Sequence, residues 1–451
     1  MALEVTVGID IGTTSVKALA VDGDGKPVAR GRVSHELLAA HAGELAHRAD
    51  AAWHDGVLAA LHALQSDARA QDRSLDIRGV NVAAMVPSLC AVDADGRPVS
   101  DGLLYGDARG AGAEDPSSSS GELVRFLAWL VREHPDAAGY WPAQAVANAA
   151  LSGVGAIDTV VAYMTAPLWD FTDWDSEVAA RVGLRDVTCL PKIVSGVDAV
   201  GTVPAAGDAV LGPGTIDALG EQLVAGADHD GDVLVILGST LIVWLVTPIA
   251  HEVEGLWTVP HTAPGKWLIG GPSNAGGLFL NWVAAALGVD LWQPGPLPAD
   301  PSRVPVWQPY LRGERVPFHD AGRRASLHDL DIGIGRDAIV RAAHEASAFA
   351  VRHQLDLAGQ PARRIVATGG GVRDGAWVQA LADGTGLPVD VVAVPEGAAL
   401  GAAWLARQTA GLEPAGADAS QWARIAFRVE PDDRWRPAGA ARYARYRELA
   451  G

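Results

Sequence analysis

The chain contains very few cysteines. Only Cys90 and Cys189 occur among 451 residues, and they lie far apart in the sequence. They can build neither a disulfide framework nor a Cys-x-x-Cys metal site. The thirteen histidines form no cluster with the spacing of metal ligands, so no zinc site is expected.

Basic residues are also scarce. Lys and Arg number 35 against 54 Asp and Glu, which gives a net charge of −19. Nucleic-acid binding relies on clustered positive charge, and the Arg323-Arg324 and Arg363-Arg364 pairs are isolated. We read these pairs as solvated faces and expect no nucleic-acid partner.

Long apolar runs are nearly absent. Residues 233–250 form one uncharged run, near the lower length limit for a membrane helix. Gly238-Ser239-Thr240 interrupts it, Pro248 closes it, and β-branched residues fill both halves, which favours two buried strands around a polar turn. The N-terminus also lacks the basic and apolar regions of a signal peptide. We therefore expect a cytoplasmic protein with no membrane partner.

The length suggests two or three domains, and the content of 49% hydrophobic and 20% charged residues is typical of a folded chain. The polar, Gly/Asp-rich segment 226–232 is the best boundary, which predicts domains over residues 1–230 and 231–451. Each half opens with an apolar strand, a Gly/Ser/Thr turn and a second strand, in residues 5–21 and 233–246. This repetition predicts two similar domains that face one cleft. The apolar spacing over residues 51–64 predicts an amphipathic surface helix.

Two Gly-rich turns have the composition of phosphate sites. In Gly12-Thr13-Thr14-Ser15, successive backbone N–H groups can form a concave anion site, with the hydroxyl groups as further donors. Asp10 next to this turn could hold Mg²⁺ through water. Gly369-Gly370-Gly371 lies between a strand at 364–367 and a helix, which allows a ligand to approach the backbone closely. An ordinary hairpin and a tight strand-to-helix turn are the simpler alternatives.

These motifs occur in an order that resembles the FGGY carbohydrate kinases. The matching segments are residues 8–17, 104–109, 158–165, 190–193, 238–240, 276–282, 311–317, 369–377 and 399–403. The resemblance implies an α/β fold of two actin-like, ribonuclease H-like domains, each with a mixed sheet of the five-stranded type flanked by helices, around a central cleft. It implies ATP and Mg²⁺ as cofactors and a small sugar, ketose, polyol or sugar acid as substrate, with a pentulose such as xylulose as the leading candidate. A homodimer is plausible on the same ground.

The resemblance also assigns roles to residues. It places the metal at Asp10 and the catalytic base at Asp217, within the small-residue stretch 214–220. A positioned base of this kind accepts the proton of the attacking hydroxyl group. The alternative reading of Asp217 is a helix cap. The nucleotide-binding residues implied are Gly12, Thr13, Thr14, Ser15, Lys17, Gly238, Ser239, Thr240, Gly277, Asn281, Gly369, Gly370, Gly371 and Asp374.

The substrate-binding residues implied are Met85, Asp107, Arg109 and Asp217. Asp107 and Arg109 would otherwise be a solvated loop pair, and Trp377 fits the core better than a stack on adenine. Residues 83–88 depart from the glutamine–methionine–histidine–glycine element of xylulose kinases, which weighs against xylulose. This departure keeps two other functions open: another actin-like ATPase, and a non-catalytic sugar or nucleotide sensor.

Overall fold

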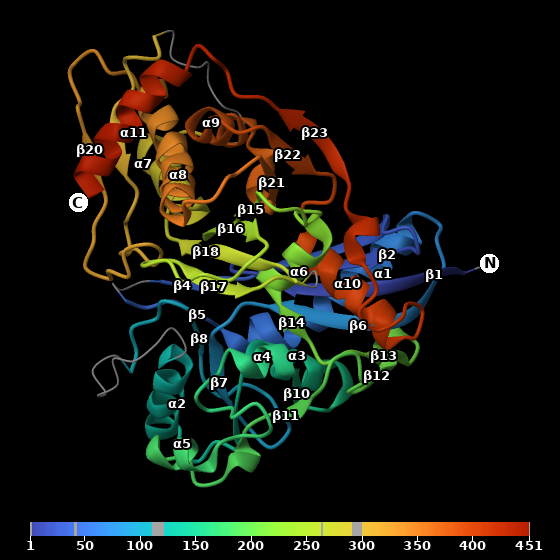
Figure 1. Cartoon of the computed structure of the whole chain (residues 1–451). Helices are drawn as coiled ribbons and strands as arrows, with labels where there is room; N and C mark the ends of the chain where they lie inside the picture. Colours follow the sequence, from blue (N-terminus) through green and yellow to red (C-terminus); the bar gives the residue numbers. More distant parts are fainter. Residues whose placement is uncertain (1, 40–42, 111–120, 263–264, 291–299, 451) are drawn as a thin grey trace. The chain divides into compact units, whose positions relative to one another are not determined.

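The computed structural model describes residues 2–39, 43–110, 121–262, 265–290 and 300–450 (Figure 1). Contacts divide the chain into two compact units. Unit 1 comprises Met1–Val224 and Ala398–Trp422, and unit 2 comprises Ala225–Gly397 and Ala423–Gly451. The first boundary lies next to the Gly/Asp-rich segment at 226–232. The linear division at residue 230 did not include the return of 398–422 to unit 1. Residues 110–121, whose Gly/Ser-rich sequence predicts a loop, lie almost entirely outside the described residues.

Unit 1 is built on a seven-stranded sheet in the order β12-β13-β6-β1-β2-β3, with β14 also paired to β6. β1, β2 and β3 form an antiparallel meander, whereas β6 runs parallel to β1, and β13 and β14 run parallel to β6. The strands are β1 (Leu3–Ile11), β2 (Ser15–Val21), β3 (Pro27–Ser34), β6 (Leu75–Ala84), β12 (Gly201–Val203), β13 (Ala209–Leu211) and β14 (Thr215–Ile216).

Helices cover both faces of this sheet. Val5, Val7, Ile9 and Ile11 alternate along β1 and enter the core formed with α1 (Gly56–Ala70) and α3 (Ala143–Ser152). On the other face a Cβ atom at Gly8 would lie 1.8 Å from the carbonyl oxygen of Ala399, so only glycine lets α10 (Gly397–Thr409) pack this closely. This close packing explains why 398–422 belongs to unit 1.

The helix predicted over residues 51–64 is present and is longer than expected. A π-helical turn, Asp50–Asp55, leads into α1, which continues to Ala70. Trp53 and Leu64 are fully buried. The prediction of an amphipathic helix is confirmed, because one face packs against β2 and β3 whereas Ala59 and His62 on the other face are exposed.

A second, smaller layer of unit 1 has a five-stranded sheet in the order β4-β5-β8-β7-β9 and its own apolar core beneath α2 and α5. A two-stranded pair, β10-β11, lies beside α4, which Asp158 caps. The elements are β4 (Leu37–Leu38), β5 (Ala46–His47), β7 (Ser88–Val92), β8 (Gly102–Leu104), α2 (Gly121–Glu133), β9 (Gly139–Trp141), β10 (Ala156–Asp158), α4 (Thr159–Tyr163), α5 (Ser176–Arg181) and β11 (Lys192–Val194).

Unit 2 is built on another seven-stranded sheet, in the order β17-β18-β16-β15-β21-β22-β23. Its strands are β15 (Asp232–Leu237), β16 (Leu241–Thr247), β17 (Trp257–Pro260), β18 (Trp267–Ser273), β21 (Arg364–Thr368), β22 (Val389–Val392) and β23 (Ile425–Val429). The apolar run at 233–250 thus forms the two predicted strands. Within the described ranges, no helix combines the length and the apolar character needed to cross a membrane.

The helices of unit 2 pack on the core that Val233, Val235 and Leu237 of β15 enter (Figure 1). They are α7 (Gly277–Leu287), α8 (Arg336–Ala358) and α9 (Gly375–Thr385), while α11 (Arg436–Ala450) packs against α8 and α9 and a two-stranded pair comprises β19 (Val306–Gln308) and β20 (Ser326–His328). The sequence over residues 336–357 also predicts a helix, which α8 confirms, and β21 confirms the strand expected at 364–367. α6 (Asp217–Ala225) ends at the boundary between the units.

Five strands follow the same plan in each sheet. The order β3-β2-β1-β6-β13 in unit 1 matches β18-β16-β15-β21-β22 in unit 2. In both, the first three are antiparallel and the last three are parallel. The predicted pair of ribonuclease H-like folds is confirmed, with additional strands beyond the expected five in each sheet.

Candidate active site

Three predicted site residues of unit 1 lie at one edge of its sheet. Asp10 of β1 is level with Ala83 of β6, and Thr215 of β14 is level with the same residue. Since these three strands are parallel, their carboxyl ends meet at this edge, where ligands of α/β sheets bind. Asp10, Met85 and Asp217 therefore emerge side by side, although up to about two hundred residues separate them in the sequence.

Asp10 is paired with Lys17 across the hairpin. The Lys17 Nζ lies 2.9 Å from the Asp10 Oδ2, and the Asp10 side chain is only 7% exposed. The Asp10 carboxylate raises the pKa of Lys17 above its usual range, and Glu221 adds to this effect. Glu221 lies one turn beyond Asp217 on α6, so the carboxylates around Lys17 come from two elements.

The first turn, residues 12–15, is a tight hairpin closed by a hydrogen bond from the Gly12 N–H to the Ser15 carbonyl oxygen at 3.1 Å. Thr14 is exposed at its tip, whereas Ser15 is buried. His35 and His47 hold the turn by hydrogen bonds between their ring nitrogens and backbone carbonyls. Sequence reasoning missed both histidines, because they lie 20 to 35 residues away and match no motif.

Asp217 is the first residue of α6, directly after β14. Its Oδ1 accepts a hydrogen bond from the Ala218 N–H at 2.7 Å, and the side chain is partly exposed. The backbone before Asp217 is fixed by buried amides: Gln144 Nε2 donates to the carbonyl oxygens of Ala84 and Thr215 at 3.0 and 3.2 Å. Gln144 was not predicted, since a lone glutamine on a helix carries no sequence signal.

The predicted sugar segment is more enclosed than a solvated loop. Asp107 is 2% exposed, and Arg109 forms two side-chain hydrogen bonds to it at 2.9 and 2.7 Å. Asp107 Oδ2 also accepts from the Leu45 N–H, so this carboxylate anchors the loop. The guanidinium of Arg109, stacked 5.4 Å above the ring of Trp129, is the more exposed of the pair. Met85 is 2% exposed and belongs to the core of unit 1.

The second turn, residues 238–240, links β15 to β16 and packs against the start of α7. The N–H groups of Gly277 and Leu278 donate to the carbonyl oxygens of Gly238 and Ser239 at 2.8 and 3.0 Å. A Cβ atom at Gly277 would lie 2.8 Å from the Gly238 oxygen, so the turn and the helix touch backbone to backbone. The predicted residue Asn281 lies one turn further along α7 and is exposed.

A buried carboxylate supports this contact from behind. Glu314 is 3% exposed; it accepts hydrogen bonds from the Ser273 hydroxyl at 2.9 Å and from the Asn274 N–H at 3.0 Å. Asn274 in turn donates to the carbonyl oxygen of Gly313. Burial raises the pKa of Glu314 to about 7. The segment 311–317 thus fixes the residues that lead into α7.

The three glycines after β21 have different surroundings. Cβ atoms at Gly369 and Gly371 would lie 2.9 and 2.8 Å from the carbonyl oxygen of Leu237, at the end of β15. Gly370 is exposed, and a Cβ atom there would meet nothing within 4 Å. The space for a close ligand is therefore at Gly370, whereas the other two glycines serve packing.

Asp374 and Trp377 are structural. Asp374 Oδ1 accepts from the N–H groups of Ala376 and Trp377 and so caps α9, while its Oδ2 lies 2.9 Å from His344 Nε2. Asp374 is 3% exposed, so its carboxylate is already occupied. Trp377 is a core residue, as the simpler reading predicted, and donates to the Ser347 hydroxyl.

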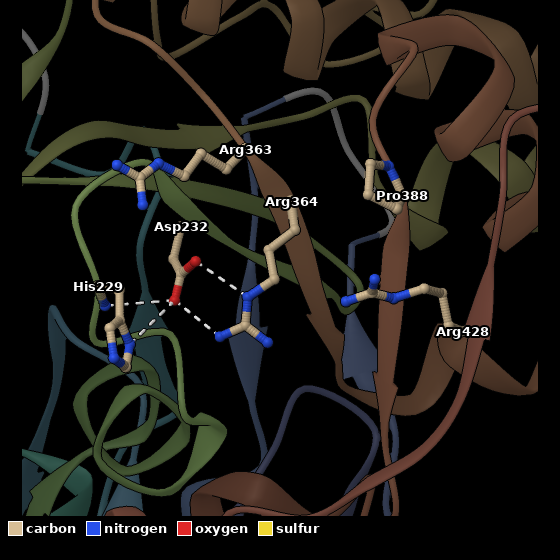
Figure 2. A pocket seen from close by; sticks show the side chains of 6 residues that line it. All are labelled: His229, Asp232, Arg363, Arg364, Pro388 and Arg428. Atoms are coloured by element: carbon tan, nitrogen blue, oxygen red, sulfur yellow. Dashed lines mark hydrogen bonds and ion pairs between the residues drawn. The ribbon is translucent and has the colours of Figure 1, made fainter.

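Figure 2 shows a pocket of about 420 Å³ in unit 2 that is not part of this site. It lies at the amino ends of β15, β21 and β22, the edge opposite to the Gly-rich turns. Arg364 forms ion pairs with Asp232 and Asp390 there, at 2.8 and 2.9 Å. The prediction that both basic pairs are solvated was therefore wrong for Arg364, and also for Arg323, which stacks 3.6 Å above the ring of Phe318.

Divalent metal binding would rest on Asp10. Within the described ranges, no group of three or more His, Cys, Asp or Glu is suited to hold a metal ion. A single buried carboxylate beside a phosphate turn fits Mg²⁺, which keeps several waters and takes its other ligands from substrate phosphates.

Comparison with known proteins places both units in one family. The model of the N-terminal domain of the FGGY family of carbohydrate kinases matches residues 5–123, and the model of its C-terminal domain matches residues 233–410. The chain is 29% identical to a xylulose kinase of Streptomyces coelicolor, over 92% of this chain and 90% of that protein. It is 26% identical to a glycerol kinase of Renibacterium salmoninarum, over 96% of this chain and 93% of that protein. The crystal structure of a gluconate kinase from Lactobacillus acidophilus superposes with a TM-score of 0.79 at 20% identity, over 99% and 98% of the chains.

Proposed function

Because the chain belongs to the FGGY family of carbohydrate kinases, we propose that it transfers the γ-phosphoryl group of ATP to a hydroxyl group of a small sugar, ketose, polyol or sugar acid. A pentulose such as xylulose is the first substrate to test, since a xylulose kinase is among its relatives. The observation that carries the proposal is the convergence of Asp10 and Asp217 on one edge of the unit 1 sheet.

In this reaction Asp217 is the general base. Its partly exposed carboxylate accepts the proton of the sugar hydroxyl group while the hydroxyl oxygen attacks the γ-phosphorus atom in line. Gln144 fixes the backbone on which Asp217 stands, because it bonds the ends of β6 and β14 together. A base held in this way contributes about 10²–10⁴-fold to the rate.

Asp10 and Lys17 would counter the negative charge of the phosphates, Asp10 through a bound metal ion and Lys17 directly. Asp10 would hold Mg²⁺, which neutralises the charge that develops on the phosphate oxygens. Lys17 keeps its positive charge because of the Asp10 carboxylate. The N–H groups of the first and second turns and the open backbone at Gly370 supply the remaining contacts with the nucleotide.

Specificity for the sugar would rest on the segment 104–109 and on the element at 83–88. Arg109, whose orientation Asp107 fixes, offers hydrogen-bond donors to sugar hydroxyl groups. Met85 replaces no polar contact, since its side chain is packed in the core. Residues 83–88 contain no glutamine or histidine, so the panel of test substrates extends beyond xylulose. Cytoplasmic location, a homodimer and the lack of a nucleic-acid partner stay predictions.

The test is coupled ADP release with ATP and Mg²⁺ against pentuloses, hexuloses, pentitols, tetritols, glycerol and aldonates. We expect one group of compounds to stimulate ADP release and the Asp217→Asn variant to lose this response. Asp175→Asn is the matched control, because Asp175 also starts a helix, α5, and its Oδ1 accepts from the N–H groups of Glu177 and Val178.

Other outcomes point to the two alternatives. ATP turnover without any sugar, retained in Asp217→Asn, would replace the proposal by another kind of actin-like ATPase. Binding of ATP or of a polyol with no ADP release across the panel would replace it by a sensor. Equal sugar-dependent rates in the wild-type and Asp217→Asn proteins would remove Asp217 as the base.

A further inference from the structure

The carbonyl groups of Gly12, Thr13 and Thr14 in the first turn all have hydrogen-bond donors outside the turn. His35 Nε2 lies 3.0 Å from the Gly12 oxygen, and His47 Nε2 lies 2.8 Å from the Thr13 oxygen. The backbone N–H of His35 donates to the Thr14 oxygen at 3.0 Å. Three successive peptide groups of a short turn thus receive hydrogen bonds from two residues outside it.

These contacts determine where the imidazole protons lie. A carbonyl oxygen only accepts, so each Nε2 must carry the proton. On His47 the other ring nitrogen, Nδ1, accepts from the indole N–H of Trp53 at 3.0 Å. His47 is therefore fixed from both sides as the neutral Nε2–H tautomer.

The surroundings of His47 keep it neutral. The residue is fully buried, and burial lowers its pKa to about 4. The titratable group that faces it is His35, whose ring meets the His47 ring edge-on at 4.4 Å between centroids, and Asp10 acts electrostatically on His35. At neutral pH His47 is thus a rigid, uncharged donor.

We propose that His47, with His35 beside it, is a positioning residue that orients the peptide groups of the first turn toward the nucleotide phosphates. The inference rests on the proposed function, since it assigns a role in phosphate binding. It concerns two residues outside the turn, which would act on the nucleotide through the peptide groups of the turn.

The physical reason lies in peptide geometry. In a trans peptide the N–H points opposite to the C=O, so each oxygen of Gly12, Thr13 and Thr14 that is held by its donor directs the N–H of the next residue away from that donor. Those N–H groups belong to Thr13, Thr14 and Ser15, the residues of the predicted anion site. Without the imidazole donors, the peptides can rotate and the anion site loses its preorganisation.

The test compares two replacements of His47. His47→Phe keeps a planar ring but has no N–H, whereas His47→Gln places an amide N–H near the position of Nε2. We expect His47→Phe to raise the KM for Mg·ATP about tenfold, the loss of one hydrogen bond in the site, and to leave the KM for the sugar unchanged. His47→Gln should restore the KM for Mg·ATP to within about threefold of wild type.

His54→Phe is the matched control, since His54 is also buried but bonds to Asp55. It should leave the KM for Mg·ATP unchanged. The proposal is overturned if His47→Phe binds Mg·ATP as well as wild type, if His47→Gln is as impaired as His47→Phe, or if His54→Phe raises the KM equally.

A spectroscopic measurement on the wild-type protein does not depend on how the variants fold. Long-range ¹H–¹⁵N spectra of ¹⁵N-histidine protein should show the Nε2–H tautomer for His47 at pH 7, assigned by its absence in His47→Gln. Finding the Nδ1–H tautomer would overturn the proposal that His47 Nε2–H donates to the first turn. If no sugar stimulates turnover, the dissociation constant of a non-hydrolysable Mg·ATP analogue replaces KM. A wild-type protein that binds no nucleotide but shows the Nε2–H tautomer would refute the kinase proposal, not the geometry.

Discussion

The first turn of unit 1 and the second turn of unit 2 occupy the same place in the same strand order, but different donors hold their carbonyl groups. Imidazole N–H groups from His35 and His47 bond to the first turn. Backbone N–H groups from Gly277 and Leu278 at the start of α7 bond to the second. In both units the carbonyl oxygens of the turn thus accept hydrogen bonds. Side chains donate them in unit 1, and the closely packed backbone of α7 donates them in unit 2.

The two turns also differ in charge. Two positions before the turn glycine, unit 1 has Asp10 and unit 2 has Ile236. The proposed base, Asp217, is in unit 1 as well. Both carboxylates that the proposed reaction uses therefore belong to unit 1, whereas the second turn offers only neutral backbone groups.

The largest effect is expected from removal of the charge of Asp10. Asp10→Asn should lower kcat about 10²–10³-fold, because the variant loses the metal ligand and leaves Lys17 without its partner. Ile236→Val, at the matching place of unit 2, should keep kcat near the wild-type value. A steady-state rate for Asp10→Asn within threefold of wild type would show that the two turns do not differ in this way.

The next effect is a pH dependence of stability that comes from Glu314, the buried carboxylate behind the second turn. Burial raises the folded-state pKa of Glu314 to about 7, above its usual range. The folded protein then holds a proton that the unfolded chain releases, so stability present below about pH 4.5 is lost as pH rises through 7, by ~3 kcal/mol in all. Urea unfolding at pH 5 and pH 8 should show this loss in wild type and a smaller one in Glu314→Gln. The same pH dependence in both proteins would contradict it.

Gly277 tests the backbone packing in unit 2. Gly277→Ala places a Cβ atom 2.8 Å from the Gly238 oxygen and should cost about 1–3 kcal/mol of stability, seen as a lower Tm. Gly375→Ala is the control, since no atom lies within 4 Å of its Cβ position at the start of α9. If both variants have the same Tm as the wild-type protein, the contact between the second turn and α7 is looser than described.

The smallest effect is expected at Gly370. A side chain there meets nothing within 4 Å, so Gly370→Ala should leave Tm unchanged. It should raise the KM for Mg·ATP about fivefold if the nucleotide approaches this backbone, about the cost of one weakened contact. An unchanged KM would show that the nucleotide does not approach the backbone at Gly370.

Much of this architecture was predictable from the sequence. The strand–turn–strand openings, α8 and β21 follow from apolar runs and Gly-rich turns, and these signals are local. The return of 398–422 to unit 1 was not predictable, since it depends on Gly8 facing α10 across about 390 residues.

The candidate site divides in the same way. Asp10, the two turns and Asp217 carry motif signals, and the sheet brings Asp10 and Asp217 together. His35, His47 and Gln144 act through hydrogen bonds to distant backbone, and such contacts leave no spacing pattern. Glu314 lies in a segment that matched the family, but its contacts with Ser273 and Asn274 could not be predicted from that match. Asp374 was assigned to the nucleotide by resemblance, although its oxygens cap α9 and contact His344.

The most direct measurement is amide hydrogen exchange with and without a non-hydrolysable Mg·ATP analogue. We expect slower exchange in peptides that cover both turns and residues 369–374, and no change in β23, at the edge of the unit 2 sheet. Unchanged exchange at both turns, in a protein saturated with the analogue, would contradict the claim that these turns bind the phosphates.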